Sequence, residues 1–190
     1  MLVERSPELI TAVGVLVVPA FLTLILRCYV RITRRSFGKD DCCLVIAGLL
    51  YGWQTYEMVQ GALDGIGVHD VLLADKPEKA MHALEHMFMI VISFTFCVLF
   101  IKLGIAYMLL RVAVNLVHLW LIRIVTAIYV VISLAVDFYV ILQCSPVEAN
   151  WDYSLLAAGT GHCGPVSVVV NLTYLITAIN IVTDWFYVGM

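Results

Sequence analysis

The chain has 190 residues, of which 63% are hydrophobic and 13% are charged. Soluble domains carry about 25% charged residues, so this composition argues against an ordinary soluble enzyme and against a nucleic-acid-binding module. The formal net charge of −3 says little by itself, because membrane orientation follows the placement of Lys and Arg in short loops.

Five long apolar segments divide the sequence, at roughly 9–28, 42–63, 83–110, 119–143 and 166–188. A helix crosses the bilayer core with about 20 apolar residues, and each segment supplies that length. Backbone groups in lipid must pair within their own segment or in a closed barrel, and uninterrupted apolar runs do not fit a barrel. The sequence therefore predicts an all-α, polytopic transmembrane bundle that forms a single domain over residues 1–190.

Basic residues gather on one side of this bundle. Eight of the eleven lie in or beside the first and third connections, namely Arg27, Arg31, Arg34, Arg35, Lys39, Lys102, Arg111 and Arg123. The positive-inside rule places these connections in the cytosol and the amino terminus outside. Segments 64–82 and 144–165 then form the outer face.

Cysteine placement agrees with this orientation. Cys144 and Cys163 both fall in the second outer connection, where disulfides persist, whereas Cys28, Cys42 and Cys43 lie near the reducing side. We therefore expect a Cys144–Cys163 disulfide that ties this connection to the outer end of the fourth helix.

Ionisable residues inside the apolar segments are costly and need a reason. Glu57, Asp137 and Asp184, together with Asn180, are expected to form a buried polar network. Such a network could be a ligand cavity or could simply hold the helices together, and we favour the second interpretation. Lys102 lies close to the cytosolic end of its segment, so we expect its ammonium to extend to the interface.

The sequence His82-Ala-Leu-Glu85-His86 fits the H-x-x-E-H arrangement of some zinc peptidases. A zinc site would also need a third ligand and an open coordination position, and the outer connections are too short to wall a substrate cleft. We therefore expect a solvated helix start here, with no catalytic residue, no bound metal and no cofactor.

Several short motifs follow one another in a fixed order. An R-x-Y-V-R string precedes an F-G-x-D-D string, and a W-D pair lies between the two outer cysteines. These positions are Arg27, Tyr29, Arg31, Phe37, Gly38, Asp40, Asp41, Trp151 and Asp152. Over nearly the whole chain this order resembles the fungal rhodopsin-domain family, seven-helix integral membrane proteins described as receptors of the Pth type.

The resemblance implies a receptor-like protein of the plasma membrane, with a ligand at the outer face and a cytosolic signalling partner at the basic inner loops. It does not imply retinal. The family continues into two further helices, so the chain resembles a member truncated after the fifth, and we expect it to be poorly stable alone or to form a homo-oligomer in the lipid bilayer. The alternatives are a non-signalling structural or interaction membrane protein or a truncated gene product and, more remotely, a zinc-dependent membrane enzyme.

Overall fold

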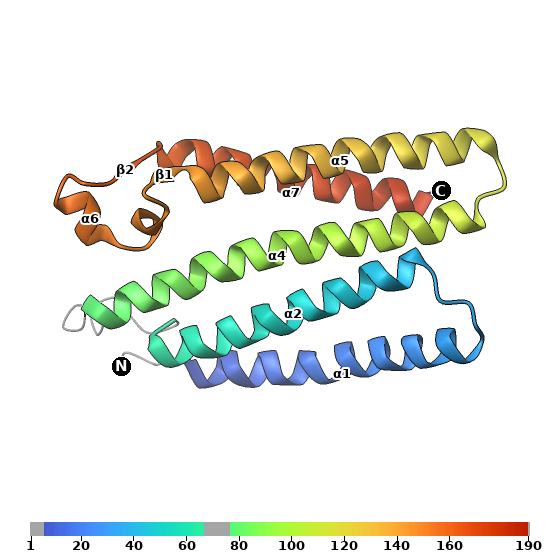
Figure 1. The fold of residues 1–190 in the computed structure, drawn as a ribbon, viewed down its shortest axis with the longest axis horizontal. Coiled ribbons are helices and arrows are strands. Elements are labelled where there is room, and N and C mark those ends of the chain that lie inside the picture. The colour runs from blue at the N-terminus through green and yellow to red at the C-terminus, as the bar shows by residue number, and fades with distance from the viewer. Residues whose placement is uncertain (1–5, 67–76, 190) are drawn as a thin grey trace.

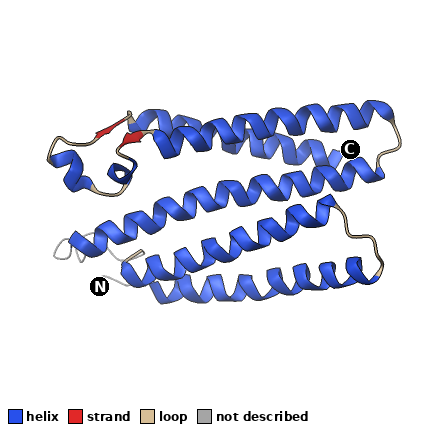
Figure 2. Ribbon diagram, viewed as in Figure 1, coloured by secondary structure: helices blue, strands red, loops and turns tan. Residues whose placement is uncertain are grey.

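The computed structural model describes residues 6–66 and 77–189, which form five long helices running side by side in alternating directions (Figure 1). Their bounds are α1 Ser6–Thr33, α2 Lys39–Asp64, α4 Pro77–Val112, α5 Leu116–Leu142 and α7 Val166–Gly189. Helix dominates the described chain (Figure 2), and the predicted all-α bundle is confirmed. Within the expected outer segment 64–82, residues 67–76 lie outside the described residues.

The expected spans fall inside these helices, except for Gln143, which directly follows α5. Four of the helices, α1, α4, α5 and α7, are long and apolar enough to cross a membrane. The helix α2 has 26 residues but is less apolar than those four. It lies between α1 and α4 (Figure 1), where neighbouring helices replace part of its contact with lipid.

Helices α2 and α4 approach each other closely along their length. Near one end, Gly61 leaves so little space that a Cβ there would collide with Ile66 and lie 3.1 Å from the Cβ of His86. In the middle, the thiol of Cys97 donates to the carbonyl of Ala47 at 3.4 Å. Small residues thus allow the two backbones to pack tightly, as is typical of membrane helices.

The other half of the bundle is built by α4, α5 and α7. One buried cluster joins Leu99, Tyr129 and Ile176, each from a different helix of the three. A second cluster, Ala106, Ile122 and Tyr187, repeats this arrangement nearer the carboxyl-terminal end of α7. Side chains from three helices therefore enclose the core around the middle of α4.

The connection between α5 and α7 is a small folded unit. Strand β1, Cys144–Ser145, pairs antiparallel with strand β2, His162–Cys163, and the predicted disulfide joins Cys144 to Cys163. Between the strands lie the 3₁₀ helix η1, Val147–Asn150, and the short helix α6, Tyr153–Ala157. Following the positive-inside expectation, we call this the outer end of the bundle and the opposite end the inner end.

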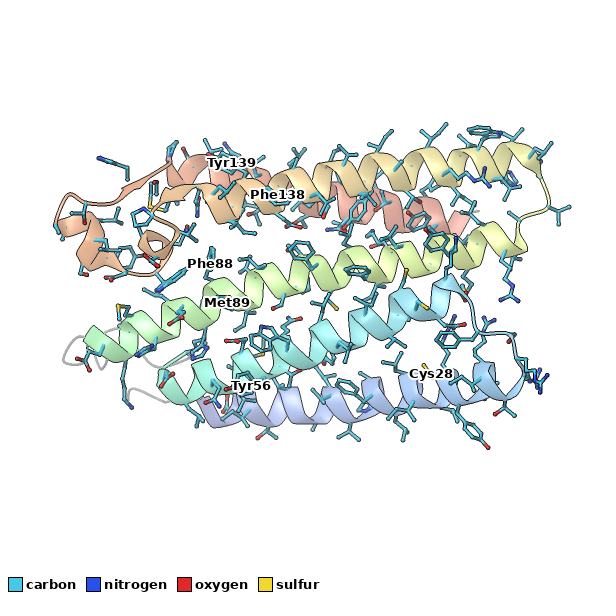
Figure 3. All side chains as sticks on the ribbon, viewed as in Figure 1. Cys28, Tyr56, Phe88, Met89, Phe138 and Tyr139 are labelled. Carbon is cyan, nitrogen blue, oxygen red and sulfur yellow. A yellow bond between two sulfur atoms is a disulfide. The ribbon has the colours of Figure 1, made fainter. Side chains whose placement is uncertain are left out.

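The outer unit also contacts the body of the bundle. Figure 3 shows Phe88 on the side of α4 that faces this unit. Its ring centroid lies 5.3 Å from that of Trp151, which directly follows η1. The disulfide and this aromatic pair hold the outer unit at both α5 and α4.

Candidate ligand cavity and its polar neighbours

A cavity of about 370 Å³ lies between α4, α5 and α7, with a contribution from Gln54 of α2. Small-molecule sites usually measure about 300–1,000 Å³, so this one could hold a compact ligand. Most of its wall is apolar, and its polar lining from α5 and α7 consists of Tyr129, Ser133, Asp137, Thr173, Thr177 and Asn180. These residues are spaced three or four apart, which puts each set on one face of its helix.

Asp137 is the charged group in this lining. Its side chain is buried, with 5% of the residue exposed, and Oδ2 has no hydrogen-bond partner among the described residues. Buried polar atoms are nearly always paired, because an unpaired one loses its hydration without compensation. The carboxylate therefore leaves an acceptor unsatisfied at the cavity wall.

Lys102 lies next to this cavity and is also buried, at 3% exposure. Its ammonium donates to Asp184 Oδ1 at 2.6 Å, to Thr183 Oγ1 at 2.6 Å and to the carbonyl of Asn180 at 3.0 Å. The prediction that Lys102 extends to the interface is therefore wrong. The reason is that α7 places a carboxylate and two oxygen acceptors beside it, which removes the need to reach water.

Two aromatic rings surround the ammonium of Lys102. Tyr129 presents its ring 4.9 Å from Nζ, and Tyr187 presents its ring 5.9 Å away. Tyr129 donates its hydroxyl to Oδ1 of Asn180 at 2.8 Å, while the hydroxyl of Tyr187 shares a hydrogen bond with Thr126 at 2.8 Å. We call Lys102, Asp184 and the side chains that contact the ammonium the lysine cluster.

Tyr129 and Asn180 belong both to the cavity and to the lysine cluster. Each lines the cavity, and each contacts Lys102, through the ring of Tyr129 and the carbonyl of Asn180. A change at the cavity wall would therefore alter the surroundings of Lys102 directly, without an intermediate residue.

Glu57 lies elsewhere, near the outer ends of α2 and α4. Its Oε2 is 2.6 Å from Nδ1 of His86, whose Nε2 is 3.2 Å from Oδ2 of Asp64. His82 is instead 3.5 Å from Glu85 on its own helix. Within residues 6–66 and 77–189 no group of His, Cys, Asp and Glu is arranged to hold a metal ion.

At the inner end, two arginines of α1 bridge two adjacent carboxylates of α2. Arg27 contacts Asp40 at 3.3 Å and Asp41 at 3.1 Å, and Arg31 contacts the same pair at 3.6 and 3.8 Å. Asp41 also accepts the backbone N–H of Gly38 at 3.1 Å, which caps the start of α2. We call these four charged side chains the arginine clasp.

Of the four residues that we expected to form one polar network, Glu57 lies apart, whereas Asp137, Asn180 and Asp184 lie in or beside the cavity. Glu57 pairs with His86, Asp137 lines the cavity, and Asn180 and Asp184 contact Lys102. The sequence did not identify His86 as the partner of Glu57 or Lys102 as the partner of Asp184. The one feature of the sequence that could have identified these partners is that Lys102 and His86 are basic or titratable residues in apolar segments. Such a residue requires a counter-charge.

The remaining motif residues have varied surroundings. Asp152 caps α6 by accepting the N–H of Ser154 at 2.9 Å, and Trp151 packs on α4. Tyr29 is exposed on α1, and Phe37 is exposed in the loop between α1 and α2.

Residues 26–190 match the family model of the fungal rhodopsin domain. No curated protein and no solved structure matches the chain.

Proposed function

Because the chain belongs to the fungal rhodopsin-domain family, we propose that it is a receptor-like protein that senses a small ligand in the cavity between α4, α5 and α7. It is an integral membrane protein with helices that span the bilayer. In this proposal it resides in the plasma membrane, and ligand binding is read at the inner end by a cytosolic partner. No catalytic step is involved.

The observation that carries the proposal is the shared position of Tyr129 and Asn180. Both side chains line the cavity and both contact Lys102 or its neighbours. A ligand can shift a conformational equilibrium only if it contacts the two states differently. A ligand that packs on Tyr129, or that competes for the Asn180 side chain that accepts the Tyr129 hydroxyl, would do so, because the ring of Tyr129 contacts Lys102.

The lysine cluster connects the cavity to the inner end. Lys102 belongs to α4, and its acceptors Thr183 and Asp184 belong to the last two turns of α7. A shift in the ion pair would therefore move the inner ends of α4 and α7 relative to each other. The basic inner loops beside them carry Arg34, Arg35 and Lys39, which suit a partner with an acidic surface.

A distance measurement across the inner end tests this proposal. Spin labels would be attached at Val114→Cys and Val188→Cys, which are 95% and 86% exposed, after replacement of the free cysteines Cys28, Cys42, Cys43 and Cys97. The protein in lipid nanodiscs would then be exposed to n-octylamine, n-octanol and n-octanoate as probes of matched length.

We expect at least one probe to occupy the cavity and to change the distance distribution between the labels. Lys102→Met should abolish that change while occupancy persists, and the matched control Lys79→Met, at an exposed lysine of α4, should preserve it. Occupancy without any change between the labels, or no occupancy by any probe, would refute the proposal.

A second function is supported by the position of Asp184. Its side chain is 61% exposed although it lies in a membrane-spanning helix and pairs with Lys102. A carboxylate open to lipid is unfavourable, so another membrane segment packed against this face of α7 would stabilise it. This observation favours an interaction protein or a homo-oligomer, and crosslinking through Trp185→Cys in native membranes would detect the contact.

A further inference from the structure

Asp137 gives the cavity one formally acidic side chain that has no basic partner among the described residues of its lining. Among the described residues that line the cavity, it alone is formally charged, and Oδ2 has no donor. The nearby ammonium of Lys102 is already committed to Asp184 at 2.6 Å and to two oxygen acceptors. The lysine therefore does not serve as a counter-ion for Asp137.

The groups that line the cavity from the other helices are uncharged. Thr95 comes from α4, Thr173 and Thr177 come from α7, and Gln54 comes from α2. Both α7 hydroxyls donate to carbonyls of their own helix, Thr173 to Val169 at 2.9 Å and Thr177 to Thr173 at 2.7 Å. They remain able to accept hydrogen bonds.

We propose that the cavity binds a small cationic amphiphile, whose protonated amine donates to Oδ2 of Asp137. The inference rests on the proposed function in using the same cavity, and it adds the chemical class of the ligand. The apolar part of such a molecule packs against Val136, Val140 and Ile176, which line the same space.

The chemistry of the lining selects this class over the others. An anion would meet the carboxylate with like charge, and a neutral apolar molecule would leave Oδ2 without a donor. A protonated amine satisfies the acceptor with a charge-assisted hydrogen bond, the stronger kind. Its remaining N–H groups can bond to the hydroxyl oxygens of Ser133 and Thr177, which line the cavity.

The test uses thiol reagents that differ in charge. Ser133→Cys would be introduced into the full chain without its free cysteines, in lipid nanodiscs. The rates of modification by aminoethyl, methyl and sulfonatoethyl methanethiosulfonate would each be normalised to a free thiol in solution. Thr177→Cys, on α7, provides a second site if the first variant fails to fold.

We expect the cationic reagent to react at least tenfold faster than the anionic one at both cysteines. Asp137→Asn should remove most of that preference, whereas Glu148→Gln, at an exposed carboxylate of the outer unit, should leave it unchanged. The reaction rates of Val131→Cys, at a position on α5 that is 67% exposed, should not depend on Asp137. Reversible n-octylamine should also protect Ser133→Cys at lower concentration than n-octanol does.

Two other outcomes are distinguishable. If all three reagents react equally and Asp137→Asn has no effect, the cavity is open but not cation-selective, which overturns this inference and leaves the proposed function standing. If neither cysteine reacts with any reagent, the cavity does not admit small molecules, and both proposals fail.

Discussion

Replacing Asp41 by alanine should destabilise the protein by about 3 kcal/mol. Asp41 is 1% exposed and accepts from Arg27 at 3.1 Å and from the backbone of Gly38 at 3.1 Å. A hydrogen bond to a charged group contributes about 1.5–3 kcal/mol, and a helix cap contributes about 1 kcal/mol. Arg27 keeps about a third of its side chain exposed, at 32%, so we take the middle of that range.

The assay is reversible unfolding by dodecyl sulfate in mixed micelles, followed by far-ultraviolet circular dichroism. Asp41→Asn should cost about half as much as Asp41→Ala, because the amide oxygen can still cap Gly38 but the charge is lost. The matched control is Asp152→Ala, which removes a cap from the five-residue helix α6 and should cost about 1 kcal/mol or less. Equal losses for Asp41→Ala and Asp152→Ala would refute the assignment of the arginine clasp as a stabilising contact.

Three further outcomes are expected from the same assay. The losses of stability caused by Lys102→Met and Asp184→Leu should be non-additive: the double variant should lose about 1–2 kcal/mol less than the sum of the two single losses. The reason is that each single change leaves an unpaired group in the membrane. Additivity within about 0.5 kcal/mol would argue against the ion pair. Gly61→Leu should destabilise the protein by about 1–3 kcal/mol through overpacking against α4, whereas Gly14→Leu, which has open space around it, should not. Equal losses for the two variants would count against the close approach of α2 and α4 at Gly61. Replacing both disulfide cysteines by serine should cost about 3 kcal/mol, because the bridge joins cysteines that are 19 positions apart in the chain. A loss below about 1 kcal/mol would contradict that estimate.

The helices and the disulfide could be predicted from the sequence because both depend on local patterns. Apolar length alone indicates a membrane helix, and two cysteines in one outer connection indicate their own pairing. The partner of Lys102 could not be found in this way, because Asp184 lies 82 residues further along the chain. Only the packing of α4 against α7 brings the two charges together.

The sequence left open whether the buried polar residues line a cavity or hold the helices together. The polar stripe of α5 could be recognised from its spacing, but the interpretation as interhelical contact and the interpretation as a cavity predict the same spacing. The structure adds a cavity of about 370 Å³ beside this stripe and an Oδ2 of Asp137 without a partner among the described residues, and both depend on how α4 and α7 pack against α5. The strands β1 and β2 were missed for a simpler reason, since two-residue strands carry no periodicity.

The arginine clasp also changes how strongly the inner end can attract lipid headgroups. Arg27 and Arg31 are neutralised by Asp40 and Asp41, and Lys102 is neutralised by Asp184. In the part of the chain that the structure describes, these ion pairs leave five of the eight basic residues of the inner side without a carboxylate partner. At about 1 kcal/mol for each basic residue near an anionic leaflet, phosphatidylserine would hold this end with about 5 kcal/mol rather than 8. The motif that ties α1 to α2 thus also weakens the adhesion of the inner face to the leaflet beneath it.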